Sequence, residues 1–187
     1  MRLVVTEFVT LDGVVEDPGG SEGLPFGGWA FRFNRGPEGD KFKFDELMAA
    51  DAQLLGRKTY EGFAAAWPSR TDDAGFAERI NTLPKYVVSR TLESADWQNS
   101  TILRGNVVDE VTRLKQQPGR DILVAGSIQL VHTLAQHQLV DEYRLMIFPI
   151  ILGSGKRLFS DGLPSTALKI IESHQTAEVV TLRLQPA

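Results

Sequence analysis

The fold is decided by the stretch Ala52-Gln53-Leu54-Leu55-Gly56-Arg57-Lys58-Thr59. Its first half is a short apolar run that ends in glycine, which is typical of a buried strand. Its second half brings two cations and a hydroxyl to the start of a helix expected over 58–66. Backbone N–H groups at a helix start point outward and attract anions. The stretch therefore predicts a strand–turn–helix unit suited to phosphate, although an ordinary connection with two solvated basic residues has the same pattern.

Two further turns share this arrangement. The run Ile122-Leu123-Val124-Ala125-Gly126-Ser127 precedes a helix expected over 128–138, and Val87-Val88-Ser89-Arg90-Thr91 ends a strand with two hydroxyls and an arginine. Taken singly, Ser127 is an ordinary helix N-cap and Arg90 a solvated cation. Ligands of open α/β sheets lie beyond the carboxyl ends of the strands. Three such turns together therefore predict a ligand with more than one phosphate, such as a dinucleotide.

The rest of the chain alternates strand and helix patterns. Strands are expected at 3–9, 52–56, 85–89, 101–104, 121–125 and 142–151, and helices at 40–50, 58–66, 74–83, after an Asn106 cap, and at 128–138. The segments 168–174 and 178–184 alternate apolar and polar residues as an antiparallel hairpin does. We therefore predict an α/β fold with a mostly parallel central sheet and a C-terminal antiparallel hairpin.

Length and composition exclude several classes of protein. The 187 residues suit a single domain over 1–187. The net charge of −4 offers no basic field for nucleic acid or an anionic membrane, and the absence of cysteine excludes disulfides, cysteine zinc sites and thiol nucleophiles. No stretch approaches the roughly 18 apolar residues of a membrane helix, and an acid at position 7 argues against a secretory signal. A cytoplasmic protein is expected. The histidines His132, His137 and His174 form no metal-ligand set.

The substrate side of the site is less sharply defined. The stretch 12–39 holds eight of the 17 glycines, and its aromatic residues favour a packed cover over a ligand rather than a linker. Asp12 follows the first strand, where site residues collect, but it equally suits a turn before Gly13. Asp45 borders the apolar face of its expected helix. It is either a solvated helix acid or a carboxyl that binds an aminopyrimidine edge.

These motifs resemble those of a known superfamily. The stretch Leu54-Leu55-Gly56-Arg57-Lys58-Thr59-Tyr60-Glu61 resembles the Gly-Arg-Lys-Thr motif of dihydrofolate reductases, and Tyr86-Val87-Val88-Ser89-Arg90 resembles their following strand. Two other stretches, Thr10-Leu11-Asp12-Gly13 and Val124-Ala125-Gly126-Ser127, are closer to the RibD C-terminal family, as is Pro149-Ile150-Ile151-Leu152-Gly153-Ser154-Gly155. That family comprises the reductase domain of bifunctional riboflavin-biosynthesis enzymes and its stand-alone bacterial relatives. The resemblance runs in order from residue 3 to about residue 184.

The resemblance implies a three-layer dihydrofolate reductase-like fold with about eight strands, NADPH as hydride donor, and a homodimer. The implied phosphate-binding residues are Gly56, Arg57, Lys58 and Thr59. The implied contacts of the adenosine 2′-phosphate are Ser89 and Arg90, and those of the pyrophosphate and nicotinamide ribose are Gly126, Ser127 and Ile128. Asp12 would border nicotinamide and substrate, and Asp45 is a loose counterpart of the catalytic acid.

The expected function is therefore an NADPH-dependent reductase that acts on a small molecule, either pteridine-like or an aminopyrimidine-ribose compound. Two alternatives stay open. The chain is a true dihydrofolate reductase, or it is a dimeric nucleotide-binding protein of the same fold that has no turnover.

Overall fold

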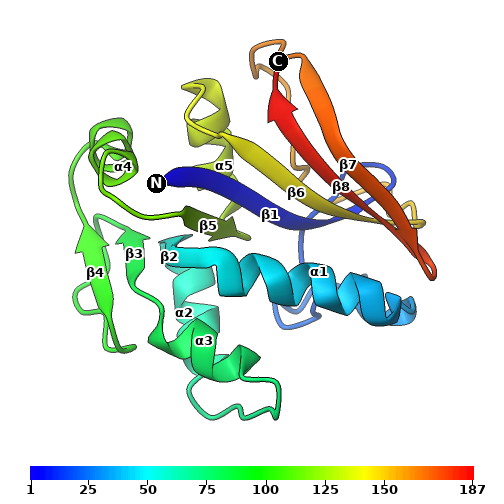
Figure 1. Ribbon diagram of the computed structural model, residues 1–187, viewed down its shortest axis with the longest axis horizontal. Helices are drawn as coiled ribbons and strands as arrows, with labels where there is room; N and C mark the ends of the chain where they lie inside the picture. The colour runs from blue at the N-terminus through cyan, green and yellow to red at the C-terminus, as the bar shows by residue number, and fades with distance from the viewer.

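Apolar strands and amphipathic helices alternate along the chain and build a layered α/β structure (Figure 1). The computed structural model describes all residues from Met1 to Ala187. Its strands are β1 (Arg2–Thr10), β2 (Ala50–Gly56), β3 (Lys85–Val88), β4 (Ser100–Leu103), β5 (Asp121–Ala125), β6 (Glu142–Phe148), β7 (Leu168–Thr176) and β8 (Val179–Pro186). Its helices are the 3-10 turn η1 (Trp29–Arg32) and α1 (Gly36–Ala49), α2 (Arg57–Ala66), α3 (Phe76–Thr82), α4 (Val107–Lys115) and α5 (Ile128–Gln136).

All eight strands form one sheet in the order β4-β3-β2-β5-β1-β6-β8-β7. The first six strands of that order are parallel, and β8 pairs antiparallel with both β6 and β7. The predicted α/β class, mostly parallel sheet and C-terminal hairpin are thus confirmed. The strand β5 comes late in the chain but lies between β1 and β2, so the connections reverse direction at this point of the sheet. Ligands of open α/β sheets bind at such switch points.

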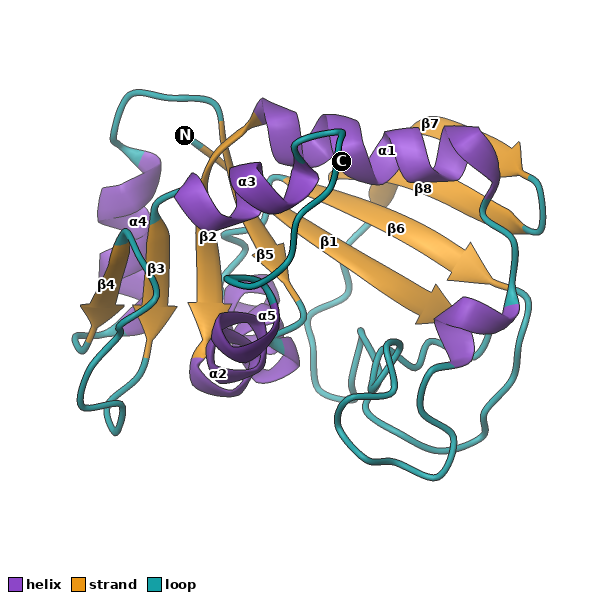
Figure 2. Ribbon diagram, turned by 90° about the horizontal axis from the view of Figure 1, so that it is seen from below, coloured by secondary structure: helices purple, strands orange, loops and turns teal.

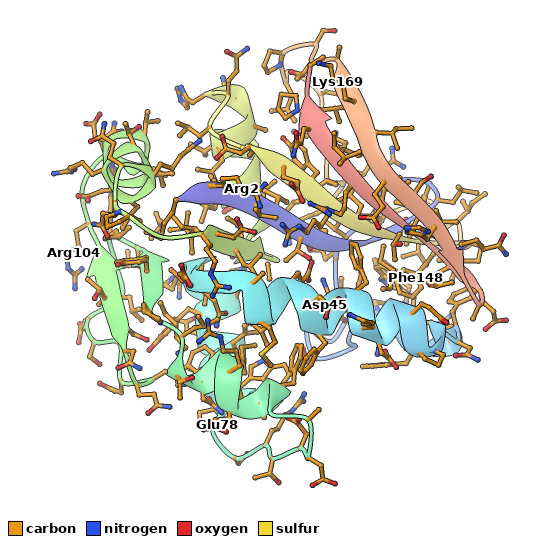
Figure 3. All side chains as sticks on the ribbon, viewed as in Figure 1. Arg2, Asp45, Glu78, Arg104, Phe148 and Lys169 are labelled. Atoms are coloured by element: carbon orange, nitrogen blue, oxygen red, sulfur yellow. The ribbon has the colours of Figure 1, made fainter.

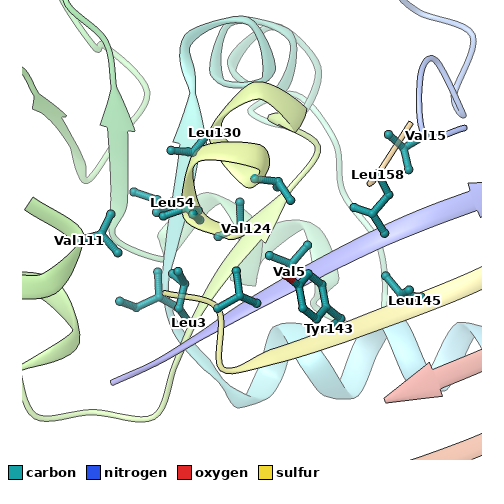
Figure 4. Close-up of a cluster of buried hydrophobic side chains, with 14 of the residues drawn as sticks. Leu3, Val5, Val15, Leu54, Val111, Val124, Leu130, Tyr143, Leu145 and Leu158 are labelled. Carbon is teal, nitrogen blue, oxygen red and sulfur yellow. The ribbon is translucent and has the colours of Figure 1, made fainter. Parts of the chain in front are cut away.

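Helices cover both faces of the sheet and give three layers. On one face, α4 and α5 pack on Leu3, Val5 and Val124, and the largest hydrophobic cluster forms there (Figure 4). On the other face, residues of α1, α2 and α3 pack against Val4 and Leu55. None of the helices is both long and apolar enough to cross a bilayer.

Element boundaries differ from expectation where proline intervenes. The strand expected to reach residue 151 ends at Phe148, because Pro149 has no N–H to continue the ladder. The helix expected from residue 40 begins at Gly36, because the fixed φ of Pro37 suits a first helical turn. Asn106 caps α4 as predicted, and its side chain accepts from the N–H groups of Val108 and Asp109.

The long glycine-rich segment after β1 is packed rather than a free linker. The fully buried ring of Trp29 meets Phe148 edge to face at 5.3 Å, and its indole N–H donates to the carbonyl of Glu16 at 2.9 Å. The buried carboxylate of Asp17 accepts from the N–H groups of Glu22 and Leu24. The segment therefore lies fixed at the ends of β1 and β6.

Lys85, the first residue of β3, carries a buried cation. The alternation of apolar and polar residues in the sequence does not predict this burial. Its side chain is fully buried, and its ammonium donates to the carbonyls of Asn81, Leu83 and Gln98 at 2.6, 2.8 and 3.2 Å. The same nitrogen lies 4.1 Å from the ring centroid of Trp97. Burial lowers the pKa of Lys85 to about 8. The ammonium thus joins the end of α3 to the segment before β4.

We predict that Lys85→Met lowers the free energy of unfolding by about 1–3 kcal/mol, because it leaves buried carbonyls without a donor. Between pH 8 and the ordinary lysine pKa of roughly 10.4, the unfolded chain holds a proton that the folded protein has released. Wild-type stability should therefore rise with pH across this window, relative to the variant. Urea denaturation at several pH values measures both effects.

The exposed Lys169 on β7 (Figure 3) offers a matched control. Lys169→Met should change stability by less than about 0.5 kcal/mol at every pH. Parallel stability curves for wild type and Lys85→Met would contradict this account of the buried ammonium.

Candidate functional site

Two strand–helix turns meet where β2 and β5 end side by side (Figure 2). The Gly56 N–H donates to the hydroxyl of Ser127 at 2.9 Å. In return, the Ser127 N–H donates to the hydroxyl oxygen of Thr59 at 2.9 Å. These two bonds join residues 71 and 68 positions apart in the chain. They fix the starts of α2 and α5 relative to one another.

Ser127 occupies the N-cap position of α5 but does not cap it through its side chain, so the expected cap is wrong. Its φ of 58° is left-handed, whereas a capping side chain needs an extended backbone to reach the first turn. The hydroxyl instead donates to the carbonyl of Ala125 at 3.2 Å and accepts from Gly56. Ser127 therefore connects the two turns.

Gly126 allows the turns to approach this closely. Its φ is +57°, and a Cβ there would lie 3.1 Å from both Cγ2 and Oγ1 of Thr59. Thr59 is thus held against the glycine while its hydroxyl oxygen receives the Ser127 N–H. The side-chain oxygens of Thr59 and Ser127 serve the joint between the turns. The backbone amides of the two helix starts are further donors at this edge.

The two helix starts have neither a side-chain cap nor an acid in the first turn. At α4, by contrast, Asn106 supplies a cap and two acids follow it. The start of α2 even carries Arg57 and Lys58, both exposed, at the positive end of the helix dipole. Cations at that end raise the free energy of the helix unless an anion is bound. Two adjacent helix starts of this kind have the donors and the positive potential that suit phosphate groups.

The third turn lies next in the sheet, because β3 neighbours β2. Ser89 is buried, and its hydroxyl accepts from the N–H groups of Thr91 and Leu92, so it shapes the turn. Arg90 and Lys58 are exposed and form no ion pair, whereas Arg57 pairs with Glu61 at 3.0 Å. The structure thus brings the three predicted turns to one edge. Ile128 begins α5 and packs its side chain on the core.

Asp12 joins the end of β1 to the segment after β6. Its carboxylate accepts from the Thr10 hydroxyl at 2.6 Å and from the N–H groups of Gly153 and Leu152 at 2.8 and 3.3 Å. The hydrogen bond from Thr10, supported by these two amides, lowers the pKa of Asp12. The carboxylate therefore stays ionised and orders this loop.

Asp45 lies on the solvent side of α1 (Figure 3), where it pairs with Lys41. The acid that turns inward is the next residue, Glu46, which is buried. Its carboxylate accepts from the Thr6 hydroxyl at 2.7 Å and pairs with Lys43. One helical step of 100° separates the two acids, and the apolar pattern of α1 is too weak to choose between them.

Glu7 is a second buried acid that sequence reasoning did not place in the site. It lies on β1, one residue beyond Thr6, which pairs with Ala125 at the end of β5. Its Oε1 atom is buried without a hydrogen-bond partner. Burial raises the pKa of Glu7 well above its ordinary value; the Lys43 ammonium opposes this rise, Glu46 adds to it, and the Gly126 N–H opposes it. An acid inside a run of β-branched residues was the signal available in the sequence.

We predict that Gly126→Ala destabilises the protein by about 1–3 kcal/mol, because alanine is strained at this φ and its Cβ presses on Thr59. Adding Thr59→Ser should recover part of the loss, since it removes Cγ2 and keeps the hydroxyl. Chemical denaturation of the two single variants and the double variant gives the coupling between them.

Gly62→Ala on α2 is the control, because a Cβ there meets nothing within 4 Å and alanine favours a helix interior. That variant should be as stable as wild type or more so. A Gly126→Ala protein with wild-type stability would contradict the close joint between the turns.

Comparison with known proteins identifies relatives across the whole length of the chain. The family model of the RibD C-terminal domain matches residues 2–182. The chain is 32% identical over 175 residues to the protein YyaP of Bacillus subtilis (strain 168), with 92% of this chain and 87% of YyaP covered. It is 29% identical over 174 residues to YwjB of the same organism, with 93% and 91% covered.

Solved structures share the fold. A protein from Shewanella sp. PV-4 named for riboflavin biosynthesis superposes with a TM-score of 0.78 at 20% identity, over 100% of this chain and 99% of its own. A pyrimidine reductase-like protein from Corynebacterium diphtheriae superposes with a TM-score of 0.66 at 13% identity, over 100% and 92%. RibD of Acinetobacter baumannii gives 0.66 at 16% identity, and the match covers 100% of this chain and 58% of RibD. With the family match over residues 2–182, the chain belongs to the RibD C-terminal domain family.

Proposed function

We propose that this protein is an NADPH-dependent reductase that transfers hydride to a pteridine-like or aminopyrimidine-ribose substrate. Its membership in the RibD C-terminal domain family supports a reductase-like protein. The single observation that carries the proposal is the pair of adjacent uncapped helix starts, with Arg57 and Lys58 at one of them. That arrangement favours a dinucleotide over a neutral ligand, because it supplies several donors and two cations at one edge.

The residues at this edge fit NADPH. The amides that begin α2 and α5 would hold the pyrophosphate, together with the side chains of Arg57 and Lys58. Arg90 forms no ion pair at the neighbouring turn and would meet the adenosine 2′-phosphate. Gly126 holds the two helix starts close together by accommodating Thr59, so that one pyrophosphate could contact both. When bound, NADPH supplies the hydride, and the protein positions it against the acceptor.

The substrate would lie beside the end of β1. Asp12 orders the loops there and stays ionised, which suits a residue that borders the nicotinamide and the substrate. On α1 we propose that Glu46, in place of Asp45, is the acid on the substrate side of the helix. Asp45 faces solvent and pairs with Lys41, whereas Glu46 is buried. The packed segment that contains Trp29 would exclude water from the reacting atoms.

The first prediction of this function concerns cofactor choice. In a fluorescence titration, NADPH should bind more tightly than NADH. Arg90→Ala should weaken NADPH binding about tenfold, the effect of one charge-assisted hydrogen bond, and leave NADH binding unchanged. Arg57→Ala should weaken the binding of both, since both carry the pyrophosphate.

Arg113→Ala on the exposed surface of α4 is the control and should bind NADPH as wild type does. Protein that binds NADPH should then oxidise it in the presence of dihydrofolate or a ribosylamino-pyrimidine phosphate, and the loss of NADPH absorbance reports the rate. If neither cofactor binds at millimolar concentration, the proposed function is wrong.

We also propose a homodimer, supported by the apolar surface of the β7–β8 hairpin. Ile170, Ile171 and Val180 are 67%, 48% and 37% exposed there. Large apolar side chains exposed on a hairpin at the edge of a sheet are candidates for a protein interface. Sedimentation equilibrium should therefore give twice the chain mass of 20.7 kDa, and Ile170→Glu should shift the protein toward the monomer. A clean monomer of the wild-type protein would contradict the proposal.

A further inference from the structure

We propose that Glu7 is the proton donor of the reaction, held as a neutral carboxylic acid beside the Gly126–Ser127 turn. This inference rests on the proposed function and adds a residue to it. In the reduction of a C=N or C=O bond, hydride reaches the carbon and the heteroatom needs a proton. None of the residues assigned to the phosphates supplies one.

The register of the sheet brings Glu7 to the site. The last residue of β5, Ala125, pairs with Thr6, so Glu7 is the first residue of β1 beyond the end of β5. The chain of β5 turns away at Gly126, the position assigned to the pyrophosphate and nicotinamide ribose. On the other side of β1, Glu7 pairs with the apolar Leu145 of β6. Its carboxyl therefore adjoins the glycine turn at the carboxyl edge of the sheet.

The charges around Glu7 favour its neutral form. Lys43 and Glu46 of α1 influence its charge from the opposite face of β1, where Lys43 is paired with Glu46 and bonded to Thr6 at 2.6 Å. Leu145 and the Gly126–Ser127 turn bring no charged side chain. Glu7 forms no ion pair of its own and its Oε1 atom has no hydrogen-bond partner, and an ionised carboxylate buried in this way is costly, so the proton is retained. Consistent with this environment, burial raises the pKa of Glu7.

The proposed step balances in atoms and electrons. As hydride reaches the acceptor carbon, the π pair of the C=N or C=O bond moves to the heteroatom. That atom then forms a bond to the proton of Glu7, and the O–H bond of the carboxyl breaks. The products are the reduced substrate, the oxidised nicotinamide and the Glu7 carboxylate. Solvent returns the proton after product release.

The state of the Glu7 carboxyl can be measured without substrate. Carbon-13 NMR of glutamate carboxyls, compared between wild type and Glu7→Gln, should reveal one carboxyl that titrates well above the ordinary range and is missing in the variant. Wild-type stability should also fall, relative to Glu7→Gln, as pH rises above the ordinary glutamate pKa, because the folded state holds a proton that the unfolded chain has released. An ionised Glu7 carboxyl at neutral pH overturns the inference.

The kinetic test separates proton donation from cofactor binding. Glu7→Gln should lower kcat by about 10²–10⁴-fold, the usual contribution of a general acid, with NADPH affinity within about threefold of wild type. Glu7→Asp keeps an acid at this position and should retain part of the activity. The alkaline limb of the wild-type kcat/KM profile should be absent in Glu7→Gln.

Glu78→Gln is the matched control, since Glu78 is exposed on α3 (Figure 3) and should leave rate and pH profile unchanged. Wild-type turnover in Glu7→Gln overturns this inference alone and leaves the reductase standing. Wild-type protein that binds no NADPH, or that binds it and reduces no acceptor, overturns the proposed function and the proton donor with it.

Discussion

The reciprocal hydrogen bonds between the Gly56–Thr59 turn and the Gly126–Ser127 turn are the constraint on which the site depends. Each turn ends one strand and begins one helix, and neither helix caps itself through a side chain. The late strand β5 makes the joint possible, because it enters the sheet between β1 and β2. Two segments about 70 residues apart thereby present their free amides side by side. The joint turns two ordinary βα connections into the single surface that we propose binds the phosphates of the cofactor.

Opposite electrostatic environments lie on the two sides of this joint. Toward β3 and α2 the surface is cationic and hydrated, with Arg57, Lys58 and Arg90 all exposed. Toward β1 the interior is acidic and dry, with the Glu46–Lys43 pair on the α1 face of the strand and Glu7 buried on the opposite face. A phosphate-rich ligand with a reactive ring at one end matches this division. The cationic side would bind the phosphates of the ligand, and the buried acids would control protons at its reactive ring.

Features set by short-range pattern could be predicted from the sequence, and those set by long-range pairing could not. The glycine-ended strands, the Asn106 cap and the C-terminal hairpin follow from local periodicity and turn chemistry. A buried cluster of charges at the other edge of the sheet does not. There Asp121 accepts hydrogen bonds from Arg2 and Arg144, and Glu142 accepts them from Arg144 and Arg183. The burial of these charged residues cannot be inferred from any one strand, because their partners lie on neighbouring strands. Burial alone would raise the pKa of Glu142, but the hydrogen bonds that it accepts from Arg183, Arg144 and Gln185 have the larger effect and lower its pKa to about 2. Glu7 could not be placed for the same reason, because its surroundings come from β6 and the Gly126 turn.

A crystal structure of the protein with NADPH tests the central claim most directly. The account predicts the pyrophosphate on the starts of α2 and α5, the 2′-phosphate at Arg90, and the nicotinamide on the side of the joint that faces Glu7. A cavity of about 530 Å³, lined by Tyr143, Phe159 and Leu168 among others, lies at the opposite edge of the sheet, where α5 ends and β6 begins. Cofactor bound in that cavity, or with its pyrophosphate away from both turns, would contradict the account.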